Sequence, residues 1–123
     1  MTPVTSSAAP SLLIVDDEPI VLAALKGRQA LQLHWGGGTP TYLNAADLKR
    51  TFQLFKDRFE FLPGAEIAIE VDPTFLESDQ LPALRELGFN RVSFGVQDLD
   101  EGVQALITRG QTWDHTLTAM KQC

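Results

Sequence analysis

The stretch from His34 to Thr41 reads HWGGGTPT, so three consecutive glycines stand directly behind a short apolar run. Because Gly36 to Gly38 lack Cβ atoms, a ligand can approach their main-chain N–H groups, and Thr39 adds a hydroxyl. Such a loop suits a carboxylate, an amine or a phosphate. It matches neither GxxxxGK[ST] nor a GxGxxG that opens a helix, so neither nucleotide-binding fingerprint applies. From these residues alone, a tight structural turn and a ligand-binding loop are equally well supported.

The elements that must position this loop follow from the apolar periodicity. Short apolar runs indicate strands at residues 11–15, 31–35, 66–71 and 91–96. Helical patterns follow these runs, with the last two around residues 101–108 and 112–122. Strands that alternate with helices imply a parallel sheet, because each crossover returns the chain in the same direction. The sequence therefore predicts an α/β fold with a four-stranded parallel sheet of βα units.

Capping residues delimit two of the predicted helices. Asn44 and Asp47 have the spacing of a helix cap, and in the next helix Ser78 is expected to cap the start and Gly88 to end it. The first of these helices carries a stripe of apolar residues on one face: Leu48, Phe52, Phe55 and Phe59. Core packing explains this stripe better than a cofactor site does.

Polar residues or glycines stand at the end of each predicted strand. In parallel α/β sheets, ligands bind beyond the carboxyl ends of the strands. The residues at these ends are Asp16 and Asp17, Gly36 to Thr39, Glu70 with Asp72, and Gln97. We therefore expect all of them on one rim of the sheet.

Composition excludes several classes of function. A formal net charge of −6 argues against a nucleic-acid groove or a polybasic membrane patch. The longest apolar runs are about five residues, well short of a bilayer span of about 20. Met1 to Pro10 is expected to be a flexible leader of a cytoplasmic protein, followed by a single domain over residues 11–123. Cys123 is the one cysteine, so no cysteine-based metal site can form within one chain.

Residues 30–123 resemble the oxygen-independent coproporphyrinogen III oxidase family of radical S-adenosylmethionine (SAM) enzymes. The resemblance rests on LHWGGGTPTYL (33–43), EIAIEVDP (66–73), LGFNRVSFGVQD (87–98) and VQALITRGQT (103–112), in family order. It implies a partial TIM-like barrel in which the glycine loop holds the methionine end of SAM. The residues that this resemblance assigns to SAM binding are Gly37, Gly38, Thr39, Glu70, Gln97 and Arg109.

The cysteines that hold the [4Fe–4S] cluster of that family, a C-x3-C-x2-C pattern before the glycine loop, have no counterpart in this sequence. A cluster needs several thiolates, and Cys123 alone cannot supply them. The expectation is therefore a protein without an iron–sulfur cluster and without enzymatic activity.

Residues 11–28, SLLIVDDEPIVLAALKGR, resemble instead the first βα unit of a response-regulator receiver domain, which has a flavodoxin-like fold. This resemblance implies that Asp16 and Asp17 bind Mg²⁺, since paired carboxylates suit a hard cation. Asp72, at the end of the third predicted strand, would then be the phosphoacceptor.

Together the two resemblances suggest a chimera, engineered or rearranged, whose function is structural and non-catalytic. The alternatives are a vestigial SAM-binding module and a receiver-like Mg²⁺-binding phosphoacceptor. A flavodoxin-like sheet would have strand order 2-1-3-4, and a partial TIM barrel would have a sequential order. If helices cover only one face, Ile67, Ile69 and Val71 or their partners would be exposed, and a homodimer could form through the uncovered face or through an edge of the sheet.

Overall fold

The computed structural model describes residues 26–96, 100–106 and 111–123. These residues form an α/β fold whose elements are, in chain order, β1 (Arg28–Trp35), the 3-10 helix η1 (Pro40–Tyr42), α2 (Ala45–Lys56), β2 (Phe59–Val71), the 3-10 helix η2 (Pro73–Phe75), α3 (Gln80–Leu87), β3 (Arg91–Phe94), α4 (Glu101–Leu106) and α5 (Trp113–Gln122). The predicted leader and the predicted strand at 11–15 lie outside the described residues.

The three described strands form one parallel sheet in the order β1-β2-β3. The predicted flavodoxin-like order is wrong for these strands, because it would separate the strand at 31–35 from the strand at 66–71. The two pair directly instead, with Leu33 opposite Ile67 and Trp35 opposite Ile69. This sequential order is the one expected of a barrel fragment. The predicted sheet has four strands, whereas three are present among the described residues.

Several element boundaries differ from the predicted ones. Phe59 does not belong to the helical stripe, because α2 ends at Lys56 and Phe59 is the first residue of a 13-residue β2. The helix α3 begins after Asp79 rather than Ser78, and Asp79 makes no capping hydrogen bond. The predictions hold where local chemistry is decisive: Asn44 accepts a hydrogen bond from the amide of Asp47, and Gly88 ends α3 in the left-handed conformation, with φ 97°.

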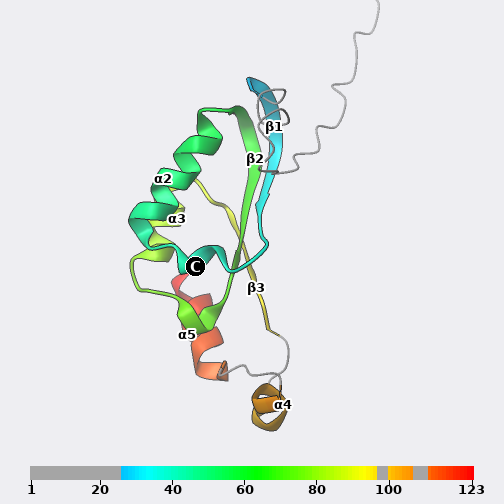
Figure 1. Cartoon of the computed structure of the whole chain (residues 1–123), viewed down its shortest axis with the longest axis vertical. Helices are drawn as coiled ribbons and strands as arrows, with labels where there is room; N and C mark the ends of the chain where they lie inside the picture. Colours follow the sequence, from blue (N-terminus) through cyan, green and yellow to red (C-terminus); the bar gives the residue numbers. More distant parts are fainter. Residues whose placement is uncertain (1–25, 97–99, 107–110) are drawn as a thin grey trace, which may run out of the picture.

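Helices α2, α3 and α5 lie on the same side of the sheet, and the core fills the space between the two layers (Figure 1). The apolar stripe of α2 packs inward as expected, with Leu48 and Phe52 almost fully buried. The largest buried apolar side chains that meet there are Leu33, Leu48, Phe52, Ile69 and Leu84. None of the described helices is both long and apolar enough to cross a membrane.

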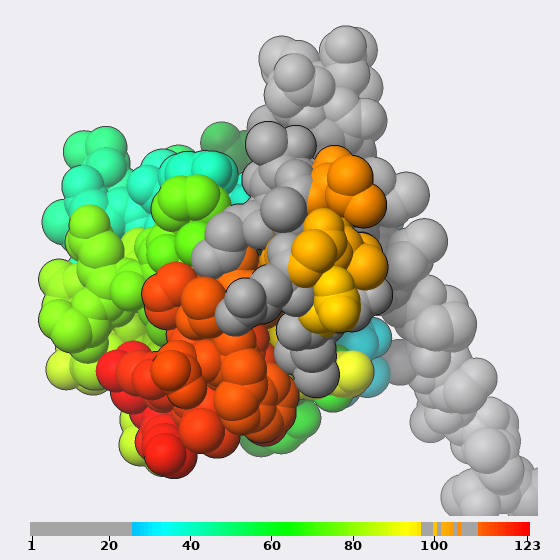
Figure 2. All heavy atoms as spheres, turned by 90° about the horizontal axis from the view of Figure 1, so that it is seen from below, coloured from blue at the N-terminus to red at the C-terminus, as the bar shows by residue number. Residues whose placement is uncertain are grey.

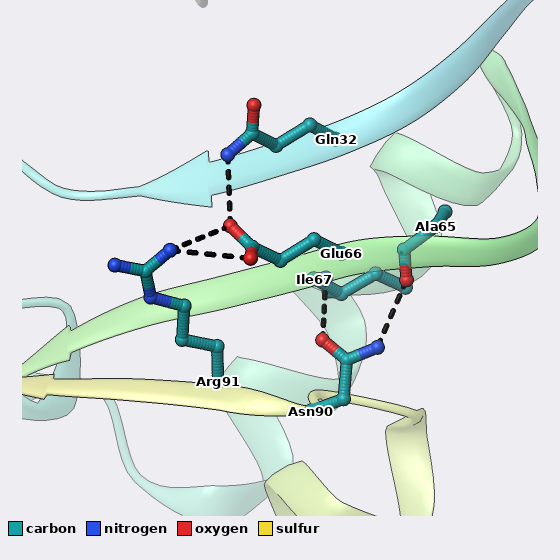
Figure 3. Close-up of polar contacts among 6 residues, drawn as sticks. All are labelled: Gln32, Ala65, Glu66, Ile67, Asn90 and Arg91. Atoms are coloured by element: carbon teal, nitrogen blue, oxygen red, sulfur yellow. Dashed lines mark hydrogen bonds and ion pairs between the residues drawn. The ribbon is translucent and has the colours of Figure 1, made fainter.

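The face of the sheet turned away from these helices is mainly polar. Gln32 donates to Glu66 at 2.8 Å, and Arg91 donates to the two Glu66 oxygens at 3.0 and 3.1 Å, so one row of side chains links all three strands (Figure 3). Ile67, Ile69 and Val71 pack against the helical layer instead. The uncovered face therefore carries the polar partners of these apolar residues, and homodimerisation through a sheet face or edge stays a prediction.

Candidate functional site

A hollow of about 320 Å³ lies at the carboxyl ends of the strands. Its lining residues come from the ends of β1, β2 and β3 and the loops that follow: Gly37, Gly38, Thr39, Pro40, Glu70, Val71, Asp72, Ser93, Phe94 and Gly95. Figure 2 views the molecule from this end, with α5 in orange and red and α4 in yellow-orange. The sheet thus brings the glycine loop and the acidic end of β2 into one concave site.

The glycine loop is shaped by its backbone. Gly37 has φ 105°, a left-handed conformation that favours glycine. Thr39 and Pro40 begin η1, and the amide of Tyr42 donates to the Thr39 carbonyl at 3.0 Å. No heavy atom lies within 4 Å of a Cβ built on Gly37 or on Gly38, so the space beside both residues is open. A ligand can therefore reach this stretch of main chain.

Glu70 stands opposite the glycine loop, near the end of β2. Its Oε1 lies 3.0 Å from Nε2 of His34, and both side chains are about half exposed, 48% and 49%. A Cβ on Gly36 would lie only 2.8 Å from Cδ of Glu70. The carboxylate therefore rests directly against the first glycine of the loop.

Asp72 also lines the hollow but is tied to its own chain. The residue is 8% exposed and its carboxylate accepts a hydrogen bond from the amide of Thr74 at 2.9 Å, which caps η2. This local capping explains the residue type without a phosphoacceptor role.

The structure brings together five of the residues predicted from the sequence: Gly37, Gly38, Thr39, Glu70 and Asp72. Gln97, Arg109, Asp16 and Asp17 lie outside the described residues.

Sequence reasoning missed His34 and Ser93. The signal for His34 was available, because strand alternation places it on the polar side of β1 while its neighbours Leu33 and Trp35 face the core. Pairing of the 31–35 and 66–71 strands would then have brought it toward Glu70.

Cys123 does not fit a metal-cluster role in this site. It lines a different groove, together with Phe89 and Asn90 at the amino end of β3. Burial raises the pKa of the Cys123 thiol, which disfavours the thiolate that binds metals. In the part of the chain that the structure describes, no three His, Cys, Asp or Glu side chains are grouped closely enough to hold a metal ion.

Comparison with known proteins gives one family. The model of the Radical SAM superfamily matches residues 9–123. The oxygen-independent coproporphyrinogen III oxidase of Escherichia coli K12 is 55% identical over 85 residues, which is 69% of this chain and 19% of that protein. The protein of the same name from Paracoccus denitrificans is 36% identical over 108 residues, 88% of this chain and 24% of the relative.

A solved structure agrees with these relatives. The coproporphyrinogen III oxidase of Escherichia coli, described as a radical SAM enzyme, superposes with a TM-score of 0.76 at 46% identity. The match covers 82% of this chain and 23% of that one. The chain thus spans about a fifth to a quarter of the length of these relatives.

These matches correct three expectations. The receiver chimera has no support, since the family match includes residues 11–28 and the Paracoccus alignment is longer than the segment 30–123. The expectation of a non-enzyme is wrong, because the relatives and the solved structure are oxidases of a radical SAM type. The family also implies an iron–sulfur cluster beside SAM, contrary to the expectation of none. Similarity over nearly the whole sequence and a shared fold lead to one conclusion: this chain belongs to the radical SAM superfamily.

Proposed function

We propose that these residues form the SAM-binding part of a protein that acts as an oxygen-independent coproporphyrinogen III oxidase. The observation that carries the proposal is the hollow at the strand ends, where the glycine loop faces Glu70. The relatives named above supply the reaction class, and the chain's own residues supply the cofactor site.

The chemistry of the site fits the methionine end of SAM, which has an ammonium and a carboxylate. The Glu70 carboxylate can accept hydrogen bonds from the ammonium, and such charge-assisted bonds are the stronger ones. The open main chain at Gly37 and Gly38 can donate N–H groups to the carboxylate, and Thr39 adds a hydroxyl. Bound SAM would supply the radical on reductive cleavage. The protein's part at this site is to bind and orient the cofactor.

The cluster that the family implies does not fit the residues present here. Cys123 is the only cysteine of the sequence and lies apart from the glycine loop. A [4Fe–4S] cluster is held by several thiolates, so its ligands cannot all come from these 123 residues.

Titration calorimetry of the 123-residue chain with SAM tests the proposal. We expect binding by the unmodified protein and about tenfold weaker binding by Glu70→Gln, which loses the charge that faces the ammonium. Gly37→Val is expected to abolish binding, because a β-branched residue disfavours a positive φ. Glu60→Gln is the matched control, since Glu60 is an exposed glutamate at the far end of the same strand. Absence of heat from the unmodified chain at millimolar SAM would refute the proposed function.

A further inference from the structure

We propose that His34 and Gly36 are positioning residues that hold the Glu70 carboxylate in place for the SAM ammonium. The inference rests on the proposed function above and goes beyond it, because it concerns residues that do not themselves contact the ligand. It assigns the first glycine of the GGG sequence to Glu70 rather than to the cofactor.

His34 reaches Glu70 across the polar face of the sheet. In the β1–β2 register His34 lies opposite Ala68, so Glu70 is two residues further along β2 on the same face. The distance between His34 Nε2 and Glu70 Oε1 is 3.0 Å. A carboxylate only accepts hydrogen bonds, so the ring Nε2–H is the donor. The contact fixes one oxygen of Glu70 and leaves the other for a ligand.

Gly36 permits the close approach of the same carboxylate. Its φ is not positive, unlike that of Gly37, so its backbone conformation is open to other residues. A Cβ at this position would instead lie 2.8 Å from Cδ of Glu70 and 2.9 Å from each carboxylate oxygen. Glycine therefore leaves room for the carboxylate where a side chain would displace it. At Gly38 a Cβ would meet nothing within 4 Å.

The strand end that carries both residues is anchored by the residue between them. The Trp35 ring packs edge-on against Phe55 of α2, with ring centroids 5.5 Å apart. With Trp35 turned into the core, His34 is directed to the opposite face. The two contacts with Glu70 therefore start from a fixed backbone. Because the contact between His34 and Glu70 is half exposed, it contributes little to folding, and we assign it to orientation of the carboxylate.

Three variants of the 123-residue chain test the inference by SAM calorimetry. His34→Leu removes the donor and is expected to weaken binding about three- to tenfold, the range for a partly exposed hydrogen bond to a charged group. His34→Gln keeps an N–H donor and is expected to restore most of the affinity. Gly36→Ala is expected to weaken binding by displacing the flexible carboxylate while leaving the urea unfolding midpoint nearly unchanged. Gln29→Leu is the control, because Gln29 makes the analogous contact with Glu60 at the other end of β1, at 3.2 Å.

A second measurement does not depend on the ligand. The Gly36 Hα resonances report whether the carboxylate lies against this glycine, so His34→Leu should shift them in the free protein and His34→Gln should restore them. Unchanged resonances in His34→Leu overturn the inference whether or not SAM binds. If the unmodified chain does not bind SAM but the resonances shift as expected, the proposed function fails and the positioning of Glu70 stands. Equal SAM affinity of His34→Leu and the unmodified protein also overturns the inference.

Discussion

The side-chain amide of Gln80 donates a hydrogen bond to the carbonyl oxygen of Thr41 at 2.8 Å, and so joins α3 to the exit of the glycine loop. The same nitrogen donates to the carbonyl of Leu43 at 2.7 Å, and Oε1 accepts from the amide of Glu77 at 2.7 Å. Gln80 is 1% exposed. One buried side-chain amide therefore makes hydrogen bonds to three main-chain groups. These bonds hold the end of the loop that begins at Gly36.

Gln80→Leu is expected to destabilise the protein by about 2–3 kcal/mol, because two carbonyls and one amide lose their partner in a buried place. Urea denaturation followed by circular dichroism measures this change in the free energy of unfolding. The control is Gln53→Leu, which makes the same change on the exposed face of α2 and is expected to cost less than about 0.5 kcal/mol. Equal effects of the two substitutions would contradict the role given to Gln80.

Asn90, which directly precedes β3, adds side-chain hydrogen bonds to the main chain of β2. Its Oδ1 accepts from the amide of Ile67 at 2.8 Å and its Nδ2 donates to the carbonyl of Ala65 at 2.9 Å (Figure 3). Asn90→Ala removes both bonds and is expected to lower the free energy of unfolding by about 1–2 kcal/mol. Asn90→Asp keeps the acceptor and should preserve the slow hydrogen exchange of the Ile67 amide. An Ile67 amide that exchanges equally slowly in Asn90→Ala would rule out this contact.

The parts of the fold that follow from local chemistry could be predicted from the sequence. The Asn44 cap, the left-handed Gly88 and the alternation that puts Ile67, Ile69 and Val71 on one face each depend on a few neighbouring residues. The carboxyl ends of parallel strands lie at one edge of the sheet. The sequence therefore also predicted that Gly37 to Thr39 would lie close to Glu70 at this edge.

The parts that depend on distant residues could not be predicted. Phe59 fits a helical stripe by spacing, but its backbone pairs with Arg28 across the sheet, and that pairing decides its conformation. Gln80 looks like an ordinary polar helix residue until η1 is placed against it. The acidic sequence at residues 16–17 suggested a receiver domain, and a resemblance over eighteen residues is too short to outweigh a family match over residues 9–123.

Leu31 and Leu33 offer a matched test of an exposed and a buried position on β1, whose register with β2 shifts between Ala30 and Gln32. Leu33 is fully buried against α2, whereas Leu31 is 59% exposed. Leu33→Ala is expected to cost about 2–5 kcal/mol, because it removes buried methyl groups and leaves a cavity in the core. Leu31→Ala on the same strand should cost less than about 0.5 kcal/mol. Denaturant midpoints of the two variants check the assignment, and a reversed order would show that the register of β1 is wrong.

Glu66 is expected to titrate below its ordinary range, because its charged form is stabilised on the polar face of the sheet. The hydrogen bond from Gln32 contributes most to lowering the pKa of Glu66, and the hydrogen bonds from Arg91 contribute next. A carboxyl group whose pKa is lower in the folded protein stabilises the fold above its unfolded pKa, and this stabilisation is lost as the pH falls through the folded value. Gln32→Leu should therefore raise the pKa of Glu66, measured by carbon NMR of the side-chain carboxyl.

Arg91→Leu should also raise the pKa of Glu66, because Arg91 both donates hydrogen bonds to this carboxylate and places a positive charge beside it. The matched control is Gln29→Leu, because Gln29 lies on the same strand and bonds Glu60 rather than Glu66. This control should leave the pKa of Glu66 unchanged. In the unmodified protein, the part of the free energy of unfolding that depends on charged Glu66 should be lost as the pH falls below about 4.5. In Gln32→Leu this contribution is smaller from the start, so the free energy of unfolding should fall less over the same pH range. A Glu66 carboxyl that titrates identically in Gln32→Leu and in the unmodified protein would mean that the row joining the three strands does not form in solution.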